Sequence, residues 1–137
     1  MSIMNLPQGI DCRARAQEKR EIALRWLNRW GYTTPNVLSH LLATPQGPEP
    51  LLGSRLITQL IKIGMVREVA CGGNWGYWKL LRNARTGRRE RQGPFLAMLT
   101  EAGKSTASGL DRLAAWASAL ARRWEKRLRL GRPVSAS

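Results

Sequence analysis

The stretch SRLITQLIKIGMVREV, residues 54–69, changes its hydrophobic period halfway along, and this change decides the fold. Up to Gly64 the apolar residues recur at helical spacing. Beyond Gly64, MVREVA at 65–70 alternates apolar and polar residues as a strand does. The sequence therefore predicts a helix with Ser54 as its N-cap that ends at Gly64 and is followed at once by a strand. The apolar face of this helix is formed by Leu56, Ile57, Leu60, Ile61 and Ile63.

Two further helices are predicted before this stretch. Residues 13–31 place their large apolar side chains on one side of a helix that stops at a glycine. Thr34 is a good N-cap and Pro35 suits the first helical position, so a short helix is expected across VLSHLLA at 37–43. TPQGPEP at 44–50 holds three prolines and a glycine and is predicted to be a loop.

Strand-like segments alternate with turns after residue 70. CGGN at 71–74 has turn residues, so the strand before it and WGYWKLL at 75–81 are predicted to form a hairpin, although a helix competes for 77–84. Residues 82–93 are expected to form a long basic loop, and PFLAMLT at 94–100 to return as a strand. The loop is then the tip of a second hairpin.

A long helix is predicted near the C-terminus. LTEAGK at 99–104 has the residues of a helix start, and the main helix is expected over 106–131, with Ser108 as its cap and Gly131 as its stop. Side chains three and four residues apart form a seam along it. This seam either packs on its own domain or pairs with a second copy in a homodimer. The seam consists of Leu110, Leu113, Ala117, Leu120 and Trp124.

Basic residues strongly outnumber acidic ones. The 137 residues include 23 Lys and Arg against 9 Asp and Glu, a formal net charge of +14, and 18 of the 23 are Arg. Thirteen basic and four acidic residues fall within 82–137. Such a surplus favours nucleic acid or an anionic surface as partner. Arginine suits phosphates and guanine edges better than lysine does, because its planar fork binds them at two points.

Other classes of function find little support in the residues. Cys12 and Cys71 have no paired-cysteine spacing and His40 is the single histidine, so we expect free thiols, no metal and no cofactor. The unpaired cysteines favour the reducing cytoplasm, and no apolar run approaches the roughly 20 residues that span a bilayer, which predicts a soluble protein without a membrane partner. The acidic residues form no paired-carboxylate motif, and no nucleophile elbow or phosphate-binding glycine loop occurs. We therefore expect no enzyme.

The order of three helices, a hairpin and a further helix resembles the winged helix-turn-helix superfamily of DNA-binding domains over residues 18–105. SRLITQLIKIGMVREV is similar to a recognition helix that leads into the first wing strand. FLAMLTEAGKS at 95–105 is similar to the last wing strand and the helix after it. Their pairing resembles regulators of the multiple-antibiotic-resistance type and plasmid replication or relaxation accessory proteins. The implied fold is mainly α with a small β-hairpin wing, an α+β fold, plus a long C-terminal helix.

The resemblance implies double-stranded DNA as partner, read in the major groove by the recognition helix and on the backbone or in the minor groove by the wing. The implied role is a transcriptional regulator such as a repressor, or a plasmid or mobile-element accessory factor in a larger nucleoprotein assembly. RNA binding, or a protein-interaction adaptor with a cationic surface, remains the alternative. The implied DNA-contacting residues are Thr33, Thr34, Asn36, Ser54, Arg55, Thr58, Gln59, Lys62, Arg82, Arg85, Arg88, Arg89 and Arg91.

The domain organisation follows from the same elements. A flexible N-terminus is expected over residues 1–12, a winged-helix domain over 13–105, the C-terminal helix over 106–131, and a flexible tail over 132–137.

Overall fold

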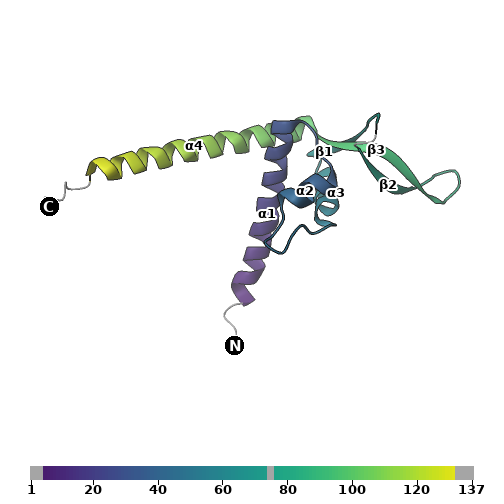
Figure 1. Cartoon of the computed structure of the whole chain (residues 1–137), viewed down its shortest axis with the longest axis horizontal. Coiled ribbons are helices and arrows are strands. Elements are labelled where there is room, and N and C mark those ends of the chain that lie inside the picture. The colour runs from purple at the N-terminus through teal and green to yellow at the C-terminus, as the bar shows by residue number, and fades with distance from the viewer. Residues whose placement is uncertain (1–4, 74–75, 132–137) are drawn as a thin grey trace.

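A computed structural model describes residues 5–73 and 76–131 of the chain (Figure 1). These residues fold into four helices and a three-stranded antiparallel sheet, so the predicted fold class is confirmed. Within the described residues, no helix has the length and apolar character that crossing a bilayer requires. In chain order the elements are α1 (Asn5–Trp30), α2 (Pro35–Leu41), α3 (Leu52–Lys62), β1 (Val66–Ala70), β2 (Tyr77–Arg82), β3 (Arg89–Leu99) and α4 (Glu101–Gly131).

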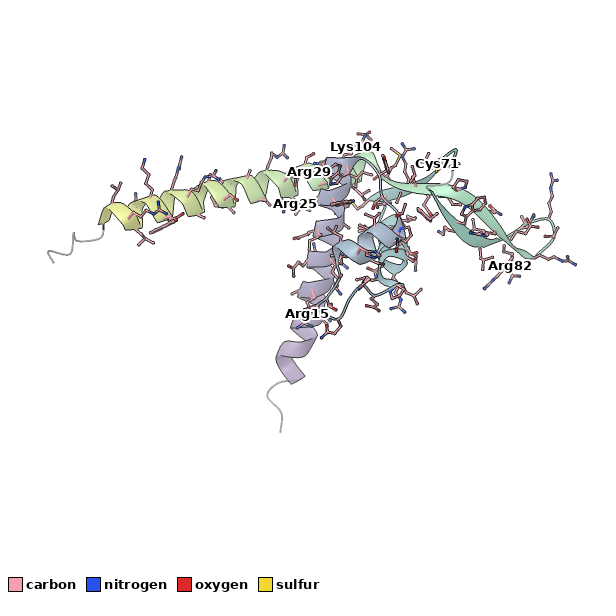
Figure 2. All side chains as sticks on the ribbon, in the orientation of Figure 1. Arg15, Arg25, Arg29, Cys71, Arg82 and Lys104 are labelled. Carbon is pink, nitrogen blue, oxygen red and sulfur yellow. The ribbon has the colours of Figure 1, made fainter. Side chains whose placement is uncertain are left out.

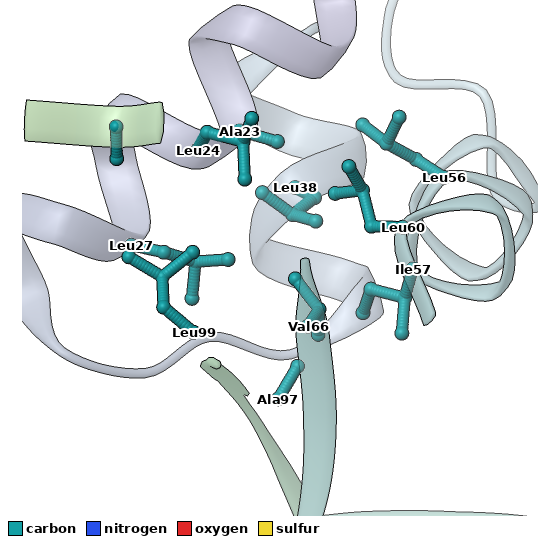
Figure 3. Packing of buried hydrophobic residues seen from close by; sticks show 11 residues of the cluster. Ala23, Leu24, Leu27, Leu38, Leu56, Ile57, Leu60, Val66, Ala97 and Leu99 are labelled. Carbon is teal, nitrogen blue, oxygen red and sulfur yellow. The ribbon is translucent and has the colours of Figure 1, made fainter. Parts of the chain in front are cut away.

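The core lies where α1, α2 and α3 meet the base of the sheet (Figure 3). Helical spacing on α1 and α3 places one apolar side of each helix against this point. Burial of each leucine or isoleucine contributes roughly 1.5–3 kcal/mol to folding before entropy is counted. The buried apolar residues are Ala23, Leu24, Leu27, Leu38, Leu56, Ile57, Leu60, Val66, Ala97, Leu99 and Ala107.

The sheet has the strand order β1-β3-β2, with β3 in the centre. The predicted hairpin between 65–70 and 75–81 is therefore wrong, because both strands pair with β3 and not with each other. The predicted hairpin with a basic tip is present, but its loop is shorter than expected. β3 already begins at Arg89, and the backbone N–H of Asn83 donates to the carbonyl of Arg88 at 2.8 Å. Half of residues 82–93 are thus strand, and 77–84 do not form the competing helix.

Helix α1 begins at Asn5, eight residues before the predicted start. Residues 5–12, expected to be flexible, are therefore helical. Pro7 does not stop the helix, because it lies in the first turn, where backbone N–H groups have no acceptor within the helix. The expected flexible tail, 132–137, lies outside the described residues, as do residues 1–4.

The start of α2 is as predicted, whereas the start of α3 is not. The hydroxyl of Thr34 accepts the N–H of Val37 at 3.3 Å, and Pro35 is the first helical residue. Helix α3 begins two residues before Ser54, which consequently is not its cap. Instead, the buried hydroxyl of Ser39 on α2 accepts the N–H of Gly53 at 2.9 Å. The preceding helix thus supplies an acceptor for the first turn of α3.

Helix α4 is continuous from Glu101, so the predicted boundary at residue 106 and the cap at Ser108 are wrong. The cap is Thr100, whose hydroxyl accepts the N–H of Gly103 at 3.1 Å. Gly103 lets the helix begin this early, because an added Cβ would meet the carbonyl oxygen of Met65. Beyond its first turns, α4 projects away from the rest of the molecule (Figure 1).

Candidate nucleic-acid interface

The outer face of α3 carries the polar residues predicted for the recognition helix. All five are exposed, while the opposite side of the helix is buried in the core. Two of them already have partners: the Thr58 hydroxyl donates to the Ser54 carbonyl at 2.9 Å, and Arg55 lies 3.5 Å from the carboxylate of Glu49. The exposed set is Ser54, Arg55, Thr58, Gln59 and Lys62.

The start of α2 contributes less to this surface than predicted. Thr33 is 3% exposed, and its backbone N–H and carbonyl both pair with Ala97 on β3 at 3.0 Å. It fills the free edge of β3 beside the core, so the prediction that Thr33 contacts DNA is wrong. Thr34 is partly exposed, and Asn36 is exposed at the first turn of α2.

The five wing arginines are all exposed but form two groups. Arg85 and Arg88 lie in the turn at the tip. Arg82, Arg89 and Arg91 lie on the strands, where the pairs Arg82 with Arg89 and Leu80 with Arg91 place all three on one face of the ribbon. Figure 2 labels Arg82 where the wing strand reaches its tip.

Asn83 organises the turn at the wing tip. Its side-chain oxygen accepts the N–H of Arg85 at 2.8 Å, and its amide nitrogen donates to Glu90 at 3.0 Å. Gly87 closes the turn with a φ of 68°, which a glycine adopts without strain. The tip is therefore a defined turn that presents two arginines.

A cleft of about 520 Å³ separates α3 from the base of the wing. Ser54 and Thr58 line it from α3, and Glu68, Tyr77 and Lys79 line it from the sheet. Glu68 accepts hydrogen bonds from the Tyr77 hydroxyl at 2.6 Å and from the Lys79 ammonium at 2.7 Å. Burial, and secondly the bond to Glu68, raise the pKa of the Tyr77 hydroxyl. The negative charge of Glu68 is thus compensated by the ammonium of Lys79, which weakens its repulsion of an anion.

Sequence reasoning missed this trio. Glu68 belongs to β1, and Tyr77 and Lys79 to β2, which are not adjacent strands. Ala97 of β3 is the register partner of Glu68, and its small side chain leaves room above the central strand. No local sequence pattern links Glu68 to Tyr77 and Lys79, because their contact depends on the strand order of the sheet.

The packed helices and the antiparallel wing form a winged-helix-like fold with a long C-terminal helix. Among solved structures, the fold is similar to that of a mutant of Lactococcus lactis ZitR in apo form, with a TM-score of 0.56. The similarity covers 93% of this chain and 83% of the other, at 13% sequence identity, and supports the predicted winged-helix fold. The sequence matches no protein-family model and no curated protein.

Proposed function

We propose that the protein binds double-stranded DNA, with α3 in the major groove and the wing on the backbone or in the minor groove. The observation that supports this proposal most is that Ser54 and Thr58 of α3 and the base of the wing line one cleft, whose acid, Glu68, is already paired with Lys79. A polyanion is therefore accommodated between them without an opposing free carboxylate. The net charge of +14 supplies long-range attraction.

Each group on this surface has a matching chemistry on the duplex. The guanidinium of Arg55 suits the O6 and N7 acceptors of guanine, and the amide of Gln59 suits adenine. Asn36 and Thr34, at the start of α2, serve backbone phosphates beside the groove. The connection between α2 and α3, which positions these residues, is held by the hydrogen bond from the Gly53 N–H to the Ser39 hydroxyl.

The wing contributes mainly through its tip. Arg85 and Arg88 are exposed in the turn at the tip of the wing and suit phosphates or a narrow minor groove. Lys79, which lines the cleft, pairs with Gln92, so it lies on the ribbon face opposite to the strand arginines. Arg82 and Arg89 therefore attract DNA at longer range more than they contact it, whereas the guanidinium of Arg91 lies 5.3 Å from the ring centre of Trp78, which lines the cleft.

A salt titration of binding to duplex fragments tests the proposal. Six phosphate contacts give a slope of about −5 for the logarithm of affinity against the logarithm of salt. Removing both tip arginines (Arg85→Ala, Arg88→Ala) is expected to reduce that slope by about 2, since each lost contact removes about 0.9. The matched control is the strand pair Arg82→Ala, Arg89→Ala, for which we expect a smaller change.

The same assay separates the alternatives. A shallow slope for the unaltered protein, or better binding to RNA of equal length and sequence than to duplex DNA, refutes the proposal. Sequence specificity appears as some fragments that retain binding above the level for random duplex. Ala at Arg55 and Gln59 is expected to lower that difference by about 1–3 kcal/mol for each base pair read.

We further propose that α4 forms the contact of a homodimer. The apolar stripe is exposed: Leu113 by 63%, Trp116 by 64% and Trp124 by 55%. Of the predicted seam, Leu110 packs instead against the core of its own domain, and Ala117 and Leu120 are exposed. Trp116 and Leu128 extend the stripe and were not predicted. Large exposed apolar surfaces of this kind mark interaction sites, and a second copy offers an identical stripe.

Sedimentation equilibrium tests the dimer. Leu120→Lys places a charge within the stripe and is expected to give a monomer. Ala115→Lys adds the same charge on the opposite side of α4, where Ala115 is exposed, and is expected to leave the dimer intact. If sedimentation gives the same molecular mass for both variants and for the unaltered protein, the apolar stripe does not form the dimer contact.

A further inference from the structure

A second concave surface lies on the other side of α3. The N-terminal half of α1 runs beside the start of α3, and the two helices enclose a cavity of about 320 Å³. Figure 2 shows Arg15 on this lower half of α1. The spacing of the α1 residues puts them in one stripe that faces α3. The lining consists of Cys12, Arg15, Ala16 and Lys19 from α1, and Leu52, Arg55, Leu56 and Gln59 from α3.

The charged residues that line this cavity are all positive. Arg15, Lys19 and Arg55 are basic, and no acid is among the described residues that line it. Within the part of the chain that the structure describes, neither Arg15 nor Lys19 takes part in a salt bridge. The bond of Arg55 to Glu49 is long, at 3.5 Å, and both side chains are mostly exposed. The positive charges of Arg15 and Lys19, beside an Arg55 that has only this long contact to an acid among the described residues, favour an anion in the cavity.

The cavity extends the DNA surface beyond what α3 and the wing provide. Ser54 and Thr58 face the cleft beside the wing, whereas Arg55 and Gln59 face α1. Helix α3 is thus bordered by a basic element on each side (Figure 1). A helix in the major groove has one phosphate backbone on either side, because the groove is about 12 Å wide. The wing serves one backbone, which leaves the other facing α1.

We propose that Arg15 and Lys19 bind a phosphate of the DNA strand that borders the major groove opposite the wing, next to the base edge assigned to Arg55. This inference rests on the proposed DNA binding and adds α1 to the surface as a third contact. The contact is to the backbone, so it sets affinity and orientation and carries no sequence information.

Two double variants, each of which removes two positive charges from α1, test the proposed phosphate contact. Arg15→Ala with Lys19→Ala removes the cavity cations, whereas Arg13→Ala with Arg20→Ala removes two cations from another side of the same helix. The first pair is expected to reduce the salt slope by about 1, the value for one phosphate, and the second pair to leave it within error. The first pair also weakens binding to all duplex sequences by the same factor. Circular dichroism verifies that both variants retain the helical content of the unaltered protein.

The exposed thiol of Cys12 supplies a second readout that needs no substitution of the basic residues. Its alkylation by iodoacetamide, followed by mass spectrometry, is expected to slow at least fivefold when duplex is bound. Inorganic phosphate at equal ionic strength is expected to leave the rate unchanged. If phosphate alone protects the thiol as well as duplex does, the cavity is a free-phosphate site and the inference is overturned.

Failure of this inference and failure of the proposed function give different results. If the unaltered protein shows no steep salt slope with duplex, DNA binding itself is wrong. If it binds with a steep slope, but the cavity variant matches its control or Cys12 stays unprotected, α1 is not a contact. Support requires both the lowered slope and the protection by duplex.

Discussion

Exchange of Gly53 for alanine is expected to disrupt the contact between α2 and α3. A Cβ at Gly53 would lie 1.8 Å from the carbonyl oxygen of Pro35, so the helices must separate by more than one ångström before that contact reaches 3.0 Å. The obstacle is backbone and does not rotate away. Such overpacking costs about 1–3 kcal/mol, and loss of the bond from Gly53 to Ser39 costs a further 1–3 kcal/mol or so. The better helix propensity of alanine offsets about 1 kcal/mol.

The net expectation is a loss of about 3 kcal/mol, or roughly 10 °C in melting temperature for a chain of this size. Gly109→Ala is the matched control, because Gly109 also lies inside a helix but has nothing within 4 Å of an added Cβ. That variant is expected to gain about 0.5–1 kcal/mol. Urea denaturation followed by circular dichroism measures both. Stabilities for Gly53→Ala and Gly109→Ala that agree within 0.5 kcal/mol or so would refute the reasoning.

Three further outcomes are expected. Ser39→Ala leaves the buried N–H of Gly53 without its acceptor and lowers the free energy of unfolding by about 1–3 kcal/mol, measured in urea; no loss would mean another group replaces the hydroxyl. The hydrogen bond from Arg25, and to a smaller extent that from Asn28, lowers the pKa of the Asp111 carboxyl. These bonds therefore stabilise the folded protein fully above pH 3.9 or so, and the stabilisation is lost as the pH falls through the lower pKa of the folded state. In Arg25→Ala the Asp111 pKa rises, which an NMR titration detects, while stability changes by less than about 1 kcal/mol because the pair is exposed. Because the pKa of Tyr77 is raised, the absorbance titration of the folded protein to pH 11 or so should be identical in Tyr77→Phe; a smaller amplitude in the variant contradicts the buried hydrogen bond.

Features set by neighbouring residues were predictable from the sequence. The period of α3 places its polar residues on one exposed face, and the pair Thr34 and Pro35 marks the start of α2. The basic tip between two strands was expected because its composition changes abruptly on either side. Each of these depends on spacing over a few residues, which periodicity captures.

Features that depend on contacts between distant segments were not predictable. Gly53 and Ser39 are fourteen residues apart, and their hydrogen bond replaces the cap expected at Ser54. Thr33 looked like an exposed polar residue near a helix start, but it completes the free edge of β3. The early start of α4 depends on the close approach of Gly103 to the backbone before β1. No local pattern contains these partners, so propensity alone misplaces the elements involved.

The continuity of α4 links the two proposed functions. β3 ends at Leu99 and α4 starts at Glu101, so the wing strand and the proposed dimer helix are joined through Thr100 alone. Asp111 then holds α4 against α1 through Arg25 and Asn28, each at 2.7 Å. A second copy bound along the rest of α4 is consequently held at a fixed position relative to α3. Such a dimer requires half-sites at one fixed separation, a whole number of helical turns of about 10 base pairs if both copies contact the same side of the duplex. Moving one half-site by five base pairs is expected to abolish the cooperative part of binding and leave the affinity for a single half-site unchanged.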